Sequence, residues 1–317
     1  MIFFKELYNW LNFYRRRIVY YNGKLECEKR KKYNIFDYIN LAKDIPLYPR
    51  SRFLQNNYYG LYRLLYKHYA QILVKDKSFI EHGLFLGNYV DNFSLTNNKI
   101  NSLLTFGSYR KKIIEKSTKK EVITTGPYIK YAESLLPRND FIALKEELGK
   151  VLLVFPSHSI ENFKHKFNID FFIEEIERIK HIGKFETVIV NMYWLDIQNR
   201  GFKKYLNKGY KITTAGHRND AYFLDRLRSV IELSNHTMSN KFGSHLGYCI
   251  NLNKPHYLFS QTHSLVVGKE GDSQLSIRES KEAQSKKEEK YFEEYFGSFQ
   301  DTITPKQKEI VIYYFGD

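Results

Sequence analysis

Small, hydroxyl and imidazole residues interrupt a Tyr- and Phe-rich chain in the stretch SNKFGSHLGY. The residues that could do chemistry there are Ser239, Asn240, Gly243, Ser244 and His245. If a helix begins at this point, its free backbone N–H groups and the nearby side-chain donors suit a phosphate group. A tight turn with an ordinary serine N-cap has the same residue types. The stretch therefore predicts a phosphate cradle or a turn.

Three other predicted strand ends carry possible hydrogen-bond donors. They are PSHS, with Ser157, His158 and Ser159; NMYWLD, at 191–196; and AGHR, with Gly216, His217 and Arg218. Ligands of open parallel sheets bind at the carboxyl ends of the strands, so these residues are expected near the SNKFGSH segment. His217 and Arg218 would then add donors beside the same anion. Either histidine can also be a simple turn residue.

A candidate proton acceptor lies in the first half of the chain, in the stretch IEHG. Glu81 and His82 follow the apolar residues of a predicted short strand. A carboxylate or an imidazole at a strand end can act as a general base. The sequence leaves open which of the two would do so, and an exposed polar turn is the alternative interpretation.

The elements that must position these residues are predicted from apolar runs and helical spacing. From residue 150 onward, buried-strand patterns alternate with helices, which indicates a Rossmann-like unit at roughly 150–262. Short strands are predicted within 78–86 and at NSLLTFG and EVITTGPYI, and a helix over 57–73. We expect an α/β protein with domains at 1–145 and 146–263, followed by a charged segment and a terminal helix over 264–317 that braces the first domain.

Composition narrows the classes of protein. The 317-residue chain has a net charge of +15, which favours anionic partners such as a phosphorylated small molecule or a membrane surface. The N-terminal stretch MIFFKELYNWLNFYRRR is apolar and then basic, unlike a signal peptide, and is expected to be an ordinary first helix or a membrane-surface helix. With two cysteines, Cys27 and Cys249, the chain is expected to be cytoplasmic, although one disulfide is conceivable.

Several familiar motifs are missing from the sequence. It has no P-loop, no GxGxxG opening the second half, no GxSxG elbow and no DxD cluster. Its histidines are scattered singly, so no metal site and no cofactor are expected. Its lysines and aromatics form no nucleic-acid-binding motif, so nucleic acid is not an expected partner.

The segment from TTAGHRND to NKPHYLF resembles the nucleotide-binding half of GT-B-type bacterial glycosyltransferases of capsule and lipopolysaccharide synthesis. The resemblance is to sialyltransferase-like and Kdo-transferase-like enzymes that use CMP-sugars. It implies two Rossmann-like domains facing a central cleft. Glu81 with Gly83 would match the acidic-acidic-Gly motif, with His82 replacing the second acid. His217 would match the His-Pro motif, with Arg218 replacing proline, and Ser239 and Ser244 would match a serine motif.

The resemblance further implies inverting, metal-independent transfer of an acidic sugar from a CMP donor. The acceptor would be a surface glycan or a lipid-linked glycan, with the enzyme held peripherally at the inner face of the cytoplasmic membrane. Two alternatives remain. One is a GT-B transferase that uses a UDP- or GDP-sugar. The other is a non-catalytic basic protein that binds a membrane surface or nucleic acid.

Overall fold

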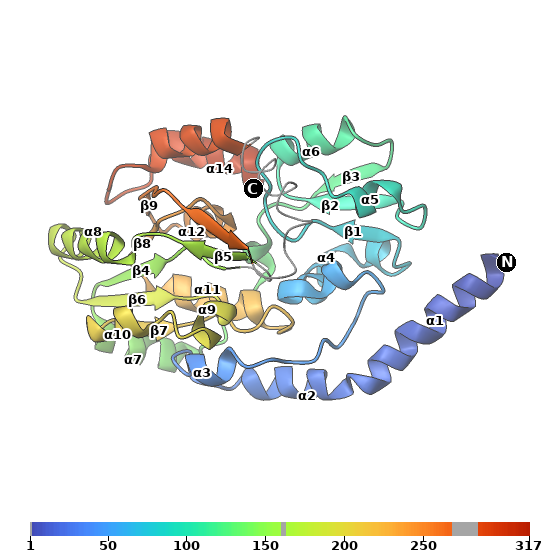
Figure 1. Ribbon diagram of the computed structural model, residues 1–317, viewed down its shortest axis with the longest axis horizontal. Helices are drawn as coiled ribbons and strands as arrows, with labels where there is room; N and C mark the ends of the chain where they lie inside the picture. The colour runs from blue at the N-terminus through green and yellow to red at the C-terminus, as the bar shows by residue number, and fades with distance from the viewer. Residues whose placement is uncertain (1, 160–162, 268–284) are drawn as a thin grey trace.

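Two parallel β-sheets form the frame of the molecule (Figure 1). The computed structural model describes residues 2–159, 163–267 and 285–317. The first sheet has the order β1-β2-β3, with strands Ser78–Ile80, Ser102–Thr105 and Glu121–Thr124. The second has the order β7-β6-β4-β8-β9, with strands Lys211–Thr213, Thr187–Asn191, Val151–Phe155, His236–Ser239 and His256–Leu258. These strands lie where the apolar runs predicted them.

The second sheet has the strand order of a doubly wound nucleotide-binding fold. If β4, β6, β7, β8 and β9 are numbered 1 to 5 along the chain, their order across the sheet is 3-2-1-4-5. The strand order reverses between β4 and β8, and ligands of such sheets bind at the carboxyl ends beside this switch point. Together with the parallel first sheet, it gives the two-unit α/β architecture of the GT-B fold and confirms the expected fold class.

Helices connect the strands and cover the sheets. They are α1 (Ile2–Val19), α2 (Tyr21–Arg30), α3 (Tyr38–Leu41), α4 (Leu61–Leu73), α5 (Asn92–Thr96), α6 (Ser108–Glu115), α7 (Arg138–Leu148), α8 (Ile169–Ile182), α9 (Trp194–Gln198), α10 (Lys203–Asn207), α11 (Phe223–Leu233), α12 (Ser244–Asn251) and α14 (Pro305–Phe315). Residues 285–296 are also helical. Two 3₁₀ segments span Leu54–Gly60 and Tyr128–Tyr131. No described helix is both long and apolar enough to cross a membrane.

Side chains alternate between two apolar layers along the strands. In β4, Val151, Leu153 and Phe155 join one buried cluster, whereas Leu152 and Val154 join another. Successive side chains of a strand point to opposite faces, so both faces of this sheet are buried. The first cluster also contains inward-facing residues of the first sheet. The two units therefore share one continuous apolar layer.

The chain termini cross between the units. Residues that precede the first sheet pack on the second: Thr213 Oγ1 donates to the carbonyl of Ile35 at 2.6 Å, and Gln198 Nε2 donates to that of Ala42 at 2.9 Å. The predicted boundary at residue 145 falls inside α7, which lies between the two sheets in the sequence. Residues before that boundary thus also pack on the second unit.

The terminal helix α14 braces the first unit, as expected. It begins with a capping box in which Thr304 and Gln307 satisfy each other's backbone N–H groups. At its other end, the Gly107 N–H donates to the Tyr314 carbonyl at 3.2 Å. Gly316 has φ +88°, and an added Cβ would lie 2.6 Å from the Cα of Gly126, so only glycine fits there.

Two local features differ from expectation. The helix expected over 57–73 begins at Leu61, because Tyr59 and Gly60 have φ values of +57° and +75°. A Cβ on Gly60 would lie 2.1 Å from the Ala221 carbonyl oxygen, so contact with the second unit fixes this turn. The antiparallel pair β5 (Phe163–Lys166) and β10 (Ser264–Val267) was not anticipated.

Candidate active site

The two strands at the switch point are tied together by their following residues. The Ser157 N–H donates to Asn240 Oδ1 at 2.6 Å, and the Ser157 hydroxyl lies 3.1 Å from His263 Nδ1. Asn240 is fully buried, and its Nδ2 donates to Gln261 at 2.9 Å. The PSHS turn and the SNKFGSH turn therefore meet, as predicted. Asn240 holds them together through both ends of its side-chain amide.

Helix α12 starts at this junction with its first turn directed at the other unit. Gly243 is the N-cap residue and has an extended backbone, with no side-chain cap. A Cβ there would lie 2.7 Å from the His245 ring, so the glycine makes room for that imidazole. The uncapped N–H groups and the positive end of the helix dipole provide an anion-binding geometry.

His245 is a neutral imidazole at the start of α12. Its ring stacks on Phe155, with centroids 4.8 Å apart and planes 15° apart. Burial lowers its pKa to about 3, and the neighbouring His158 acts in the same direction. Its Nε2 is shielded from solvent and has no hydrogen-bond partner among the described residues. A buried polar atom left unpaired in this way is typical of a site that a ligand completes.

The first unit reaches the switch point through the loop after β1. The Leu84 N–H donates to the Ser244 hydroxyl at 3.0 Å, and that hydroxyl lies 3.9 Å from a Cβ built on Gly83. The Glu81–Gly83 segment therefore faces the N-terminus of α12. Two motifs separated by about half the chain are brought together, as the sequence predicted.

Glu81 is held in a buried ion pair. Arg110 binds both of its carboxylate oxygens, with Nη2 2.5 Å from Oε1 and Nε 3.0 Å from Oε2, and Thr105 donates to Oε2 at 2.6 Å. Both carboxylate oxygens of Glu81 are therefore bound by the fully buried Arg110 and by Thr105. The structure thus places Glu81 in a buried ion pair with Arg110.

His82 remains as the candidate base. Its ring is half-buried and has aromatic neighbours, with centroids 5.9 Å from Phe85, 6.2 Å from Tyr58 and 6.4 Å from Tyr59. The Tyr58–Tyr59 turn was not among the predicted site residues, since NNYYGLY has the spacing of a helix. The left-handed conformation of Tyr59 is uncommon for a bulky residue and is often found at functional sites.

Ser239 does not join the site. It is the last residue of β8, is fully buried, and its hydroxyl lies 2.9 Å from His256 Nε2. Thr237, two residues earlier on the same side of the strand, contacts the other nitrogen of that ring at 2.8 Å. The period of two along a strand thus directs both hydroxyls into the interior. The expected phosphate contact from Ser239 is wrong.

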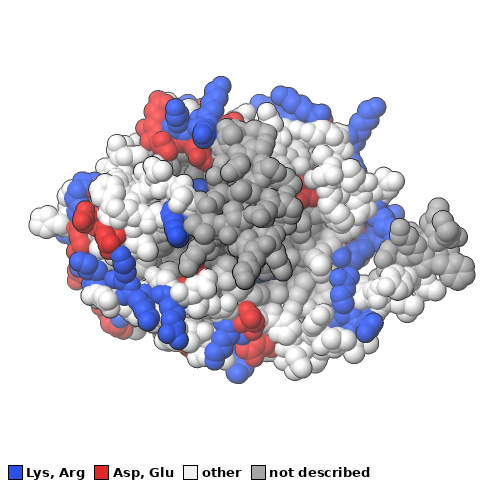
Figure 2. Space-filling view, in the orientation of Figure 1, with Lys and Arg blue, Asp and Glu red and all other residues white. Residues whose placement is uncertain are grey.

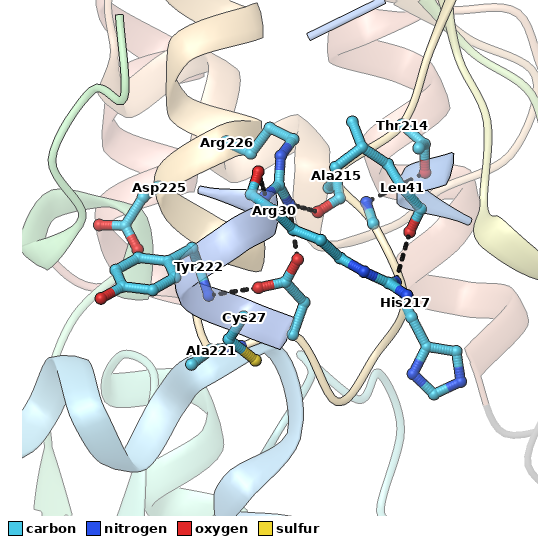
Figure 3. A network of polar contacts seen from close by, with 12 residues as sticks. Cys27, Arg30, Leu41, Thr214, Ala215, His217, Ala221, Tyr222, Asp225 and Arg226 are labelled. Atoms are coloured by element: carbon cyan, nitrogen blue, oxygen red, sulfur yellow. Dashed lines mark hydrogen bonds and ion pairs between the residues drawn. The ribbon is translucent and has the colours of Figure 1, made fainter. Parts of the chain in front are cut away.

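Buried arginines brace the loop after β7. Arg226 Nη1 donates to the Ala215 carbonyl at 2.7 Å and pairs with Asp220 at 3.0 Å, while its Nη2 donates to the Arg30 carbonyl at 3.1 Å (Figure 3). Gly216 has φ +101°, and a Cβ there would lie 2.9 Å from the Arg226 guanidinium. The loop that contains Gly216, His217 and Arg218 is therefore fixed by Arg226 of α11, which is itself bound to the last residue of α2.

His217 is neutral and lies in the loop after β7, at the edge of the second sheet. Burial lowers its pKa to about 4, its ring lies 4.2 Å from that of Trp194, and its Nδ1 accepts the Asn219 N–H at 3.1 Å. Three strand spacings separate β7 from β8, roughly 14 Å. His217 therefore does not add positive charge beside the anion site of α12, which corrects the expected convergence on one phosphate.

Aromatic residues lie between the PSHS turn after β4 and the loop after β7 that contains His217 and Arg218. His158 lies 4.5 Å from the ring of Tyr193, which hydrogen-bonds the Tyr59 hydroxyl. The Tyr59 N–H in turn donates to the Arg218 carbonyl at 2.7 Å, and the Arg218 guanidinium lies 5.0 Å from the ring of Tyr58. Ser159 is bound through its N–H to Asp196 at 3.0 Å. The residues after β6 and β7 thus contact one turn of the first unit, and those after β4 contact Tyr193.

Tyr193 lies in the strand-end segment NMYWLD, which was expected near the site. The sequence offered little warning of Tyr58 and Tyr59, because tyrosine is frequent throughout the first half of the chain. Within residues 2–159, 163–267 and 285–317, no three acidic, His or Cys residues are arranged to hold a metal ion. Cys27 and Cys249 are separate buried thiols.

Comparisons with known proteins give distant structural matches. No protein family and no curated protein sequence matches the chain. Among solved structures, the S. aureus MnaA–UDP co-structure matches with a TM-score of 0.38 and 14% identity, over 58% of this chain and 52% of that chain. The wall teichoic acid polymerase TagF matches with a TM-score of 0.37 and 14% identity, over 58% of this chain and 49% of that chain.

A third match is UDP-GlcNAc 2-epimerase from Methanocaldococcus jannaschii in complex with UDP-GlcNAc and UDP. Its TM-score is 0.36 and its identity 12%, over 55% of this chain and 52% of that chain. This chain thus matches about half the length of each of the three structures.

Proposed function

We propose that the protein is an inverting GT-B glycosyltransferase that takes a sugar from a nucleotide-activated donor. The observation that carries the proposal is the contact between the Leu84 N–H and the Ser244 hydroxyl. It sets the loop that contains His82 against the uncapped N-terminus of α12, at the switch point of a doubly wound sheet. A proton acceptor and an anion-binding helix end are the two parts that metal-independent glycosyl transfer needs.

In the proposed reaction, the donor phosphate lies against the first turn of α12. The backbone N–H groups after Gly243 and the unpaired Nε2 of His245 donate to its oxygens. Because His245 is neutral, it contributes a hydrogen bond rather than a charge, and the positive end of the helix supplies the favourable field. The residues after β4, Ser157–Ser159, lie beside the same anion.

His82 acts as the general base. It removes the proton of an acceptor hydroxyl while that oxygen attacks the anomeric carbon from the face opposite the phosphate. The new carbon–oxygen bond forms as the bond to the phosphate oxygen breaks, and its electron pair leaves with the nucleotide. The ion pair between Glu81 and Arg110 fixes the backbone that carries His82.

For the donor, we propose a CMP-activated acidic sugar of the sialic acid or Kdo type. Support for this choice comes from the sequence resemblance and from Arg218, a cation at the rim that can pair with a sugar carboxylate. A UDP- or GDP-sugar is the second candidate. The proposed acceptor is a bacterial surface glycan or its lipid-linked precursor, and the proposed place of action is the cytoplasm.

Thermal unfolding with CMP, UDP and GDP tests the donor class. A nucleotide present at a hundred times its dissociation constant should stabilise the protein by about 2.7 kcal/mol. Stabilisation by CMP alone supports the proposal, and stabilisation by UDP or GDP alone transfers it to the second candidate. If none of the three stabilises the protein, the transferase proposal is wrong.

Two variants test the assigned groups. His245→Phe keeps the stacking on Phe155 but removes the unpaired nitrogen, and it should weaken nucleotide binding by on the order of tenfold. His181→Phe, at an exposed site on α8, is the matched control and should bind normally. His82→Gln should retain nucleotide binding and lower turnover by roughly 10²–10⁴-fold. Unchanged turnover in His82→Gln would exclude His82 as the base.

A further inference from the structure

Helix α1 has an apolar face that no described part of the chain covers. Its members lie three or four residues apart and so share one side of the helix. They are Leu7, Trp10, Leu11, Tyr14 and Ile18. All are well exposed, Ile18 at 78% and Trp10 at 55%. We call them the α1 stripe. Figure 1 shows α1 projecting from the body of the molecule.

The opposite side of α1 is the side that contacts the body. Asn12, Phe13, Arg16 and Arg17 are half-buried, and Arg17 Nη2 donates to the Tyr48 hydroxyl at 2.9 Å. The Arg17 guanidinium also lies over the ring of Tyr48, at 5.4 Å. These contacts fix the rotation of the helix about its axis. The α1 stripe is therefore directed outward by packing on its other side.

Basic residues surround the base of the helix. A hollow of about 560 Å³ between α1 and the first unit is lined by Arg15, Arg16, Arg52 and Lys99, together with Phe53 and other apolar or amide side chains. No carboxylate is among the described residues that line it. Lys and Arg side chains gather near this end of the molecule in Figure 2. The surroundings of the stripe are thus suited to an anionic partner.

The α1 stripe differs from the other exposed apolar residues. Ile39 and Ile182, for example, are exposed on other helices and are not part of such a row. Isolated exposed apolar side chains are common in proteins, whereas a contiguous exposed patch with a polar rim marks an interaction surface. The stripe extends over twelve residues, from Leu7 to Ile18, or roughly 16 Å of helix.

We propose that α1 is a docking helix that lies in the surface of an anionic lipid membrane. The α1 stripe enters the boundary between headgroups and acyl chains, and the exposed Arg15 beside it contacts the lipid phosphates. Aromatic and aliphatic residues on one face with arginines beside it are the features of an interfacial helix. A second copy of the chain is less suited as the occupant, because it would bring an equal set of cations to the same place.

This proposal is independent of the proposed transferase activity. The stripe and the hollow include none of the residues that form the candidate active site. A protein that binds lipid and no nucleotide would contradict only the proposed function. A protein that binds nucleotide and no lipid would contradict only the docking helix.

The two tryptophans allow a direct test with the full chain. Trp10 is exposed, whereas Trp194 is buried at 5% exposure, so a change in fluorescence on adding vesicles reports on α1. Phosphatidylglycerol vesicles should shift the emission to the blue, brominated acyl chains should quench it, and phosphatidylcholine vesicles should have little effect. Trp10→Phe should abolish the shift while the protein still sediments with the vesicles. No shift and no sedimentation with phosphatidylglycerol would overturn the proposal.

Surface variants separate the apolar and the ionic contributions. Ile18→Ser should lower vesicle binding by on the order of tenfold, whereas Ile182→Ser, at a site with 52% exposure, should not. Arg15→Gln should weaken binding in low salt and have less effect in high salt, and exposed Lys208→Gln is its control. If Ile18→Ser instead dissolves a dimer seen by sedimentation and no vesicle binding occurs, a second copy is the occupant and the membrane proposal is wrong.

Discussion

The turn before α12 and the loop before α11 follow two strands of the same sheet, but they are stabilised differently. The loop before α11 is held by Arg226, which contacts two carbonyls and one carboxylate. The turn before α12 has an uncapped glycine and a buried imidazole nitrogen without a partner among the described residues. The first loop therefore has its polar partners within the protein, whereas the second has the unpaired groups on which the proposed phosphate site rests.

Removing the brace should have the largest effect. Arg226→Ala leaves the fully buried Asp220 carboxylate without its cation and frees the carbonyls of Ala215 and Arg30. Loss of one member of a buried ion pair costs about 3–5 kcal/mol of unfolding free energy. Urea denaturation measures this loss. A change below about 1 kcal/mol would show that the loop before α11 does not depend on its arginine.

Acid should destabilise the protein through the buried imidazole of His217. Burial lowers its pKa to about 4 in the folded protein, from the ordinary histidine value of 6.5, so the unfolded chain binds the proton first as the pH falls. Stability should therefore be full above pH 6.5 and decrease between pH 6.5 and about 4, by at most about 1.4 kcal/mol per pH unit for this group. His217→Gln should reduce the slope of that part of the pH profile, measured by denaturation at several pH values, and leave the slope caused by other buried histidines such as His245. An unaltered slope would contradict the neutral, buried assignment.

Filling the space beside Gly243 should lower stability less than the loss of Arg226 does, and it should weaken nucleotide binding. Gly243→Ala places a methyl group 2.7 Å from the His245 ring and should cost about 1–3 kcal/mol as that ring shifts. Nucleotide binding should fall together with the shift, because His245 and the N–H groups of α12 move apart. Calorimetric titration compared with the melting temperature measures both effects. Normal affinity in Gly243→Ala would exclude the turn as a phosphate site.

A pair of serine variants should show the smallest changes and the sharpest contrast. Ser244→Ala removes the acceptor for the Leu84 N–H at the junction of the units, and Ser239→Ala removes the partner of His256 in the interior. Each should cost about 1 kcal/mol of stability. Only Ser244→Ala is expected to alter turnover, since Ser239 is far from solvent. Equal loss of turnover in both would contradict the different placement of the two hydroxyls.

The strands and most helices could be predicted because their signals are local. Continuous apolar runs mark β4 and β6, and Asn168 and Gly183 mark the ends of α8. The approach of the β1 loop to α12 could also be anticipated, since both motifs follow strands and carry donors or acceptors. For such elements, the residue types within the segment are enough to predict its structure.

Other features depend on residues distant in the sequence and could not be predicted. The turn at Tyr59 and Gly60 packs on residues more than half a chain length away: the Tyr59 N–H donates to the Arg218 carbonyl, and Gly60 lies against the carbonyl of Ala221. The role of Ser239 depends on which face of β8 it occupies, and this is decided by one residue of register. The distance of His217 from α12 follows from the strand order, which the sequence does not display.

The apolar layer shared by the two sheets has a consequence for how the molecule unfolds. A protein whose halves are joined by a linker can lose one lobe and keep the other, but here Leu153, Leu104 and Phe315 belong to one buried cluster. Melting either half exposes the other, so a calorimeter should record a single cooperative transition. Gene fragments that encode one sheet alone should yield chains that aggregate, because each would expose its part of this shared layer.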